Sequence, residues 1–429
     1  MRLELRIVRI ASVQFAANTA LQQGVLSVDR RALVELLRQD TRLGGIDVEL
    51  ANPGDKCRIL NTVDIFEPRA RVAGSGPDFP GLLGPQASAG HGVTCVLRGA
   101  SVIVNDFGLS AGQYQRPGEG IVDMWGPGAE YGPYGKLCHV VVLAKPANGV
   151  GIDDYCVALK TAGLKAAVYL AQAGADLQPD LIEVYETKLL HEASVALKAL
   201  PRVTYIFQTF TNQRIPLPGD PVLYGQPVDK MVPTILHPNE VMDGALTDPF
   251  RGYSETYVLQ NHPMIKELYQ NHGKTLCFAG VIICNAPNNA PEHARTANVA
   301  ANLAKWTLDA DGVVLTKIGG GAPELTMALT AQRCEELGIR TTLALMHQGI
   351  DASEITMKAS TVFANVPQVD AMVSMGVSTV GPMLDLAPAE RVIGALAAVQ
   401  DGAAMRRSAA DIKGVFSQLG DSNFMAVRY

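Results

Sequence analysis

The stretch from Asp311 to His347 constrains the fold of this chain more than any other. It opens with the apolar, β-branched run Gly312-Val-Val-Leu-Thr316 and continues into three glycines, Gly319, Gly320 and Gly321. Apolar residues at helical spacing follow, and then a second apolar run at 341–346. A strand, a glycine-rich loop, a helix and a second strand in this order predict an α/β fold.

The glycine-rich loop is also a candidate binding site. Glycines accept positive φ and let a ligand approach the backbone, and Pro323 fits the first turn of a helix. Free amides at such a helix start can hold a carboxylate or a phosphate, so Gly319 to Gly321 are candidate substrate-binding residues. Glu324 is a candidate too, because it would adjust the local charge. The alternative is a tight turn in which Glu324 itself occupies the amides, since no dinucleotide or phosphate-loop motif is present.

Composition limits the classes of function. The chain has 429 residues, 48% of them hydrophobic, which is enough for a large core and for two or three domains. A net charge of −6 without a basic run argues against nucleic acid and anionic membrane as partners. No apolar run approaches the roughly 20 residues of a membrane-spanning helix. Seven cysteines without a CxxC pair indicate neither a disulfide framework nor a zinc site, so we expect a cytoplasmic protein.

The pattern of apolar residues, glycines and prolines predicts that the chain divides into three parts. Residues 1–145 contain short alternating runs broken by Gly- and Pro-rich turns and predict a mainly β N-terminal domain. Residues 146–225 and 226–429 alternate strands with amphipathic helices, so we expect a helix-covered parallel sheet. In the first of these two parts we expect helices over 153–173 and 187–200 and strands over 181–185 and 202–208. The loop from Gly120 to Tyr134 carries Asp123, Trp125 and Glu130, and Glu130 is a candidate substrate-binding residue. Domain docking is the alternative role for this loop.

Several expected strands end at residues whose side chains could act as a nucleophile, a base or a metal ligand. The runs 231–236, 276–283 and 341–346 end at His237, Cys284 and His347. Open parallel sheets bind ligands at the carboxyl ends of their strands, so these residues should gather with the glycines at one rim if the strands are neighbours. Cys284 with His237 or His347 would supply a nucleophile and a base. The alternative for Cys284 is a small buried core residue.

A divalent metal is another possibility. His237, Glu240 and Asp243 are spaced by threes and could share a helical face, with His347 or Cys284 completing the site. Glu240 and Asp243 are equally explained as helix-start acids or solvated loop residues, and Asp243 is also counted among the candidate catalytic residues. The cofactor therefore stays unknown. Three other histidines, His262, His272 and His293, are expected to be structural. His262 and His272 are expected to be surface and capping residues.

Short stretches along nearly the whole chain resemble one protein family. Taken in order, they resemble the proprotein subunit of component B of the glycine/sarcosine/betaine reductases. The resemblance implies a subunit of a multi-subunit enzyme of amino-acid or amide metabolism, in a hetero-oligomer with a component-B-like second subunit, in a homo-oligomer, or in both. The stretches include Glu49-Leu-Ala-Asn-Pro-Gly54, Glu67-Pro-Arg-Ala-Arg-Val72, Gly126-Pro-Gly-Ala-Glu-Tyr131, Gly163-Leu-Lys-Ala-Ala167 and Glu240-Val-Met-Asp-Gly244.

The resemblance also implies a pyruvoyl group, made by self-cleavage at an Asn-Cys bond shortly after the equivalent of Glu240 to Ala245. Its carbonyl forms a Schiff base with the amino group of the substrate. Here the chain continues Leu246-Thr-Asp-Pro-Phe-Arg-Gly-Tyr-Ser254 and contains no Asn-Cys pair. We therefore expect an unprocessed homologue without a pyruvoyl group, unless Ser254 replaces the cysteine.

Three functions stay open. The first is a component-B-like subunit that acts with a partner on a small amino-acid-like or cyclic amide substrate, by hydrolase- or lyase-type C–N chemistry. The second is a non-catalytic subunit that organises a reductase-like complex. The third is a true reductase subunit with a non-standard pyruvoyl precursor.

Overall fold

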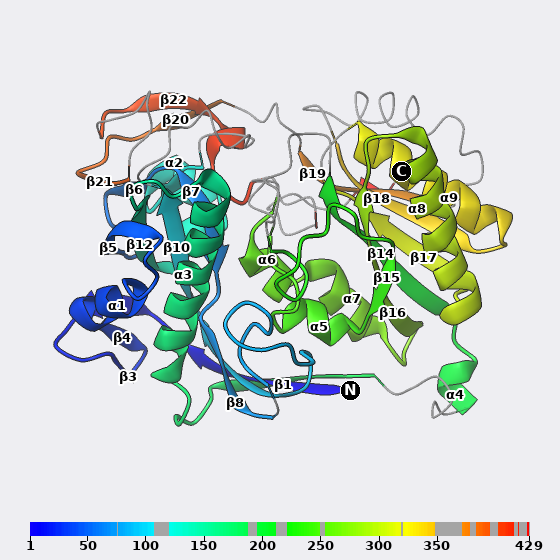
Figure 1. Cartoon of the computed structure of the whole chain (residues 1–429), viewed down its shortest axis with the longest axis horizontal. Coiled ribbons are helices and arrows are strands. Elements are labelled where there is room, and N and C mark those ends of the chain that lie inside the picture. The colour runs from blue at the N-terminus through cyan, green and yellow to red at the C-terminus, as the bar shows by residue number, and fades with distance from the viewer. Residues whose placement is uncertain are drawn as a thin grey trace.

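The computed structural model describes residues 1–74, 76–106, 120–187, 195–211, 221–248, 254–318, 321–347, 371–377, 383–394, 402–415, 419 and 427–428. The chain is an α/β protein, as the sequence predicts. N-terminal sheets form one side of the molecule and a larger sheet forms the other, with three short helices between them (Figure 1). These helices are α5 (Pro238–Met242), α6 (Thr256–Gln260) and α7 (Pro263–Asn271).

The N-terminal side is rich in strands, as expected. One four-stranded sheet has the order β13-β1-β9-β8 and another has the order β5-β12-β10-β7. Both are mixed, because β1 runs parallel to β9 and β10 runs parallel to β12. Their strands are β1 (Arg2–Arg9), β5 (Leu43–Ala51), β7 (Thr62–Phe66), β8 (Arg69–Ala73), β9 (Gly92–Arg98), β10 (Ala100–Asp106), β12 (Cys138–Pro146) and β13 (Leu181–Glu186). A small sheet of β2 (Ser12–Phe15), β3 (Ala20–Gln22) and β4 (Val25–Val28) lies beside α1 (Arg30–Leu37).

Helix α3 (Ile152–Gln172) covers both four-stranded sheets and matches the helix expected over 153–173. Its buried residues join one apolar core with side chains from β5, β7, β10 and β12. Gly163 allows the closest approach. A Cβ atom at that position would lie 2.3 Å from Cε2 of Phe66 and 2.7 Å from Cγ1 of Val104. Any side chain there would push the helix away from the sheet.

The other side of the molecule is a seven-stranded sheet with the order β15-β16-β14-β17-β18-β19-β23. The five central strands are parallel, and both edge strands are antiparallel. Numbered along the chain, the parallel strands follow the order 2-1-3-4-5 of a doubly wound sheet. The strands are β14 (Arg202–Thr211), β15 (Thr234–Leu236), β16 (Cys277–Ala286), β17 (Gly312–Thr316), β18 (Arg340–His347), β19 (Ala371–Val377) and β23 (Val427–Arg428).

Helices cover the two faces of this sheet. Side chains from α5, α6 and α7 pack on one face against Tyr205, Phe207 and Val281. On the other face, α8 (Ala290–Asn302) and α9 (Ala322–Glu336) pack against alternate residues of the same strands, including Ile206 and Cys284. This alternation follows from the two-residue period of a strand. No helix in the described ranges is long and apolar enough to cross a membrane.

Residues 383–394 and 402–415, which we call the C-terminal segment, return to the N-terminal sheets (Figure 1). Strand β21 (Arg391–Ile393) pairs in parallel with β6 (Cys57–Ile59), which also pairs with β11 (Val122–Asp123). Arg58 on β6 donates to both carboxylate oxygens of Asp123, at 2.6 and 3.0 Å, and also to the carbonyls of Ala387 and Ala403. The loop from Gly120 to Tyr134 thus docks the C-terminal segment. Also formed are α2 (Gly126–Tyr131), α4 (Val195–Lys198), β20 (Met383–Leu386) and β22 (Met405–Ser408).

Two local expectations need correction, and a third lies partly outside the described residues. The strand expected at 181–185 forms as β13, but it pairs antiparallel with β1 at a sheet edge and takes no part in the large parallel sheet. Of the helix expected over 187–200, the described residues contain α4, and 188–194 lie outside them. His262 was expected at the surface, yet it is fully buried and packs edge-on against Tyr205 and Phe207. Two aromatic neighbours from a distant strand explain this burial.

Candidate functional site

The strand-end residues do not gather at one rim. Strand β15 is antiparallel to β16, so His237, which follows Leu236, the partner of Val281, lies toward the start of β16. Cys284 lies roughly 13 Å further along β16, given about 3.3 Å per residue. His347 ends β18, and two strands separate β18 from β16, which amounts to roughly 14 Å. The expected convergence of these three residues is therefore wrong, because the order and direction of strands cannot be read from one sequence.

Cys284 lies in the apolar core beneath α8 and α9 and is fully buried. Burial raises the pKa of its thiol to about 12. This environment suppresses the thiolate that a nucleophile needs. The backbone of His347 pairs with Val377, but its side chain lies outside the part of the structure that can be described. A catalytic role for either residue stays a prediction.

His237 and Glu240 start helix α5 as a capping box. The His237 ring accepts from the backbone amide of Asn239, and Glu240 accepts from the backbone amide of His237 at 2.6 Å. The other ring nitrogen of His237 contacts the Thr187 hydroxyl at 2.6 Å, and burial lowers the pKa of the ring to about 4. Within the described residues, no three His, Cys, Asp or Glu side chains form a group that could hold a metal. The helix-start alternative accounts for Glu240.

Asp243 caps the end of α5 and is buried. Its carboxylate accepts from the Arg71 guanidinium at 2.6 Å, from the Gly90 amide at 2.8 Å and from the Thr94 hydroxyl at 3.1 Å. These three donors tie α5 to the β8–β9 sheet. A catalytic role for Asp243 stays a prediction.

At the glycine-rich loop, Gly319 and Gly320 lie outside the described residues. Gly321 has a φ of 80° and precedes α9, and its amide donates to Glu324 at 3.1 Å. Glu324 also pairs with Lys317 at 3.3 Å. Glu324 thus occupies the helix start, as the tight-turn alternative expects. Glu130 lies on α2 with an exposed side chain. Ligand binding at these residues stays a prediction.

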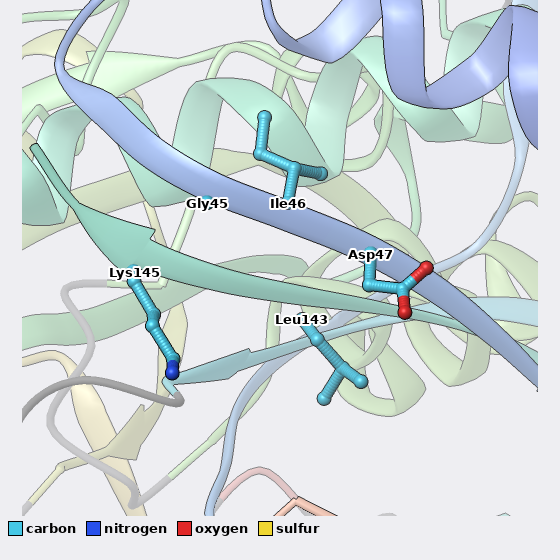
Figure 2. Close-up of a pocket in the computed structure, with 5 residues that line it drawn as sticks. All are labelled: Gly45, Ile46, Asp47, Leu143 and Lys145. Atoms are coloured by element: carbon cyan, nitrogen blue, oxygen red, sulfur yellow. The ribbon is translucent and has the colours of Figure 1, made fainter.

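A concavity of ≈ 280 Å³ lies on the edge strand β5 and its neighbour β12 (Figure 2). Lys145 and Leu143 project to one side of the strands, whereas Ile46 points to the other side, toward the helices. Asp47 is already paired with Arg30 at 2.7 Å. This shallow edge offers few polar groups to a ligand.

A buried network surrounds the segment that follows α5. The Ser254 hydroxyl donates to Oδ1 of Asp248 at 2.6 Å, and the Asp248 amide donates to the Thr256 hydroxyl at 3.0 Å. Thr256 in turn donates its amide and its hydroxyl to the two carboxylate oxygens of Asp64, at 2.8 and 2.7 Å. All four residues are at most 1% exposed. Oδ2 of Asp248 is buried and has no hydrogen-bond partner among the described residues.

Charged side chains from distant parts of the chain reach this network. Lys413, from the C-terminal segment, pairs with Glu255 at 3.0 Å, and the Tyr134 hydroxyl donates to the same carboxylate at 2.8 Å. Lys160 on α3 is fully buried and donates to the carbonyl of Pro221. We call the residues Asp64, Lys160, Asp248, Ser254, Glu255, Thr256 and Lys413 the buried ionic cluster.

Burial controls the protonation of the cluster. It raises the pKa of Asp248 to about 6, although the Ser254 hydroxyl and the charge of Lys413 oppose the shift. The pKa of Asp64 is raised well above its usual value, first by burial and then by the negative charge of Asp248. Perturbed pairs of this kind concentrate at functional sites, although structural networks produce them too. The ionisation of Asp248 therefore opposes the ionisation of Asp64.

Sequence reasoning singled out only Ser254 from this cluster. Its members come from β7, from α3, from the segment 248–256 and from Lys413, so no motif joins them. The one available signal is Lys160, which interrupts the apolar face of a long helix.

Comparison with known proteins assigns the chain to a protein family. The profile of the glycine/sarcosine/betaine reductase component B subunits matches residues 1–412. The chain belongs to this family. No solved structure matches it. The matches extend over nearly the whole chain, as the sequence stretches indicated.

Individual relatives cover most of both chains. The chain is 37% identical over 347 residues to "Glycine reductase complex component B subunits alpha and beta" of Acetoanaerobium sticklandii, covering 80% of this chain and 78% of the relative. It is 34% identical over 403 residues to "Sarcosine reductase complex component B subunit alpha" of Peptoclostridium acidaminophilum, covering 92% and 90%. It is 30% identical over 411 residues to "Betaine reductase complex component B subunit alpha" of the same organism, covering 94% and 90%.

The pyruvoyl group that the resemblance implies does not fit the residues present. Residues 246–254, where the resemblance places the cleaved bond, contain no cysteine. Ser254, the residue that could replace it, is 1% exposed, and its hydroxyl is held by Asp248. An electrophile at this buried position would not meet the amino group of a substrate.

Proposed function

We propose that this chain is a component-B-type subunit of a reductase complex and binds a small amino-acid-like substrate without carrying the electrophile itself. The observation that carries the proposal is the family match over residues 1–412. The relatives are named for glycine, sarcosine and betaine reductases. These three compounds share a carboxylate one carbon away from an amine or ammonium nitrogen. A compound with these two groups is the proposed substrate.

The proposal assigns the activation of the substrate to another polypeptide, because this chain has no Asn-Cys pair and its Ser254 is buried. We propose that a component-B-like second subunit supplies that step. The relatives are named as components of reductase complexes, and nothing in those names favours the hydrolase- or lyase-type C–N chemistry expected from the sequence.

The test is purification of the chain from its own host under non-denaturing conditions, followed by titration of the purified material with glycine, sarcosine and betaine. Co-purification of a second component-B-type subunit and binding of at least one of the three compounds would support the proposal. A chain that purifies alone and binds none of them would contradict it.

An organising subunit is the second candidate, favoured by buried ion pairs that hold distant segments together: Arg58–Asp123, Arg71–Asp243 and Lys413–Glu255. It predicts that the partner binds substrate equally well with and without this chain. Titration of the complex and of the isolated partner separates the two functions.

A further inference from the structure

A cleft of ≈ 390 Å³ lies between the β13-β1-β9-β8 sheet and the helices α6 and α7. Arg98 at the end of β9 lines one side, and Tyr257, Asn261 and Lys266 line the other. This volume falls in the range of small-molecule sites, which often lie where two parts of a protein meet.

Arg98 is held in place by two carboxylates, and one of its nitrogens has no acceptor in the described part of the chain. Its Nε donates to Glu67 at 3.3 Å and its Nη1 donates to Glu183 at 2.9 Å. Its Nη2 is buried and has no hydrogen-bond partner among the described residues. A buried donor without an acceptor costs free energy unless a ligand satisfies it. Arginine presents its nitrogens as a planar fork that matches a carboxylate.

Lys266 brings a second cation to the same cleft. Its ammonium group donates to Oδ1 of Asn261 at 2.8 Å, which leaves further donors for a ligand. Burial lowers the pKa of Lys266, although the nearby carboxylate of Glu67 opposes the shift. An anion in the cleft would compensate this unfavourable burial of charge.

The carboxylates nearby do not use up these cations. Glu67 is fully buried and accepts twice from Arg69, at 2.8 and 2.6 Å, and once from Asn261 at 3.0 Å. Glu183 accepts from Tyr185 in addition to Arg98. The rim residue Glu267 is exposed and accepts from Asn271. The cations Arg69, Arg98 and Lys266 therefore face two buried or half-buried carboxylates, those of Glu67 and Glu183. The third carboxylate, that of Glu267, lies in solvent.

Helix α6 is tied to the sheet beside the cleft and also carries a residue of the buried ionic cluster. The amide side chain of Gln260 pairs with the backbone of Glu67 through two hydrogen bonds, at 2.8 and 3.1 Å. Thr256 and Tyr257 are consecutive residues of α6. One helix therefore carries both a hydrogen-bond donor to Asp64 and a residue that lines the cleft. Fixed donors on rigid elements are what a specific binding site requires.

We infer that this cleft binds the carboxylate of a small amino-acid-like molecule between Arg98 and Lys266. The inference rests on the proposed function for the class of substrate. The carboxylate would accept from the guanidinium of Arg98, whose side chain is 29% exposed, and from the ammonium group of Lys266. The half-buried ring of Tyr257 would form a wall beside the rest of the molecule.

The first experiment compares ligands that differ only in the carboxylate. The purified complex is titrated calorimetrically with betaine and with choline, and with glycine and with glycinamide. The cleft predicts that betaine or glycine binds and that its partner without a carboxylate binds at least about tenfold more weakly, the loss expected for one charge-assisted hydrogen bond. Equal binding within a pair would overturn the inference.

The second experiment locates the site. Lys266→Gln keeps an N–H donor on a side chain that is one atom shorter and removes the charge, and should weaken binding by about tenfold. Lys274→Gln, at an exposed position just beyond α7, is the matched control and should bind normally. Arg98→Gln is a second variant, in which Arg69 still neutralises Glu67. Wild-type affinity in folded Lys266→Gln and Arg98→Gln proteins would overturn the inference and leave the proposed function standing.

A third measurement separates the cleft from the proposed function. Acetate serves as the probe, and the rate of acylation of Lys266 is followed by peptide mass spectrometry with Lys274 as the internal reference. The cleft predicts that acetate slows acylation of Lys266 and not of Lys274. Protection by acetate without binding of glycine, sarcosine or betaine would support a carboxylate site and contradict the proposed substrate class. Absence of protection would contradict the site itself.

Discussion

Ser254 and Asp248 form a buried hydrogen bond of 2.6 Å at the place where the family resemblance implies a self-cleaved bond. The hydroxyl of Ser254 satisfies one oxygen of a carboxylate that is out of contact with water. This contact joins the segment after α5 to Thr256 and Asp64. Asp248 and Ser254 are thus part of the core in this chain.

We predict that the chain stays one uncut polypeptide. Intact mass and a denaturing gel should show the full-length species in both the wild type and Ser254→Ala. The reason is the missing Asn-Cys pair and the burial of Ser254. Two fragments that meet near residue 250, with a carbonyl that reacts with hydrazine and disappears in Ser254→Ala, would contradict the prediction.

The buried carboxyl of Asp248 should make stability depend on pH. Its pKa in the folded chain is raised to about 6, above the roughly 3.9 of an unfolded aspartate. Its contribution is therefore fully present below about pH 4 and is lost as the pH rises through about 6. Two pKa units correspond to about 3 kcal/mol. Asp248→Asn keeps an acceptor for Ser254 and should lack this loss.

The measurement is urea unfolding of the wild type and Asp248→Asn at several pH values between 4 and 7. Asp47→Asn, which changes an exposed carboxylate, is the control. Parallel stability curves for the wild type and Asp248→Asn would show that the carboxyl does not titrate in this range.

Arg58 should hold the C-terminal segment to the N-terminal sheets. Arg58→Met leaves the buried carboxylate of Asp123 uncompensated and removes two bonds to the carbonyls of Ala387 and Ala403, so we expect a loss of about 3–5 kcal/mol. Lys56→Met breaks the exposed pair with Glu390 between the same two segments and should change stability little. Chemical unfolding measures both, and equal effects would refute the difference between buried and exposed pairs.

The thiol of Cys284 should be unreactive in the folded protein. Its pKa of about 12 leaves almost no thiolate at about pH 8, and the side chain is fully buried. Iodoacetamide labelling followed by peptide mass spectrometry should find Cys284 unmodified in the native chain and modified in urea. Rapid native labelling, together with loss of ligand binding in Cys284→Ala, would revive its catalytic role.

Local patterns in the sequence determined the individual elements of this fold. The apolar periodicity of α3, β14, β16, β17 and β18 is carried by neighbouring residues, so the expected bounds fall within a few residues of the observed ones. The capping role of Glu240 and the helix start at Glu324 are local as well, since each side chain reaches an amide three residues away. The family could be inferred from the sequence because its short stretches keep their order over the whole chain.

Only the tertiary structure decided which of these residues meet. The antiparallel direction of β15 separates His237 from Cys284, and the strand order separates Cys284 from His347. The buried ionic cluster and the Arg98–Lys266 cleft each join segments more than a hundred residues apart. Neither strand order nor the loss of water around a charge is encoded by neighbours in the chain. Both arise when distant segments pack, and that packing turns Asp64, Asp248 and Lys266 from ordinary charged residues into perturbed ones.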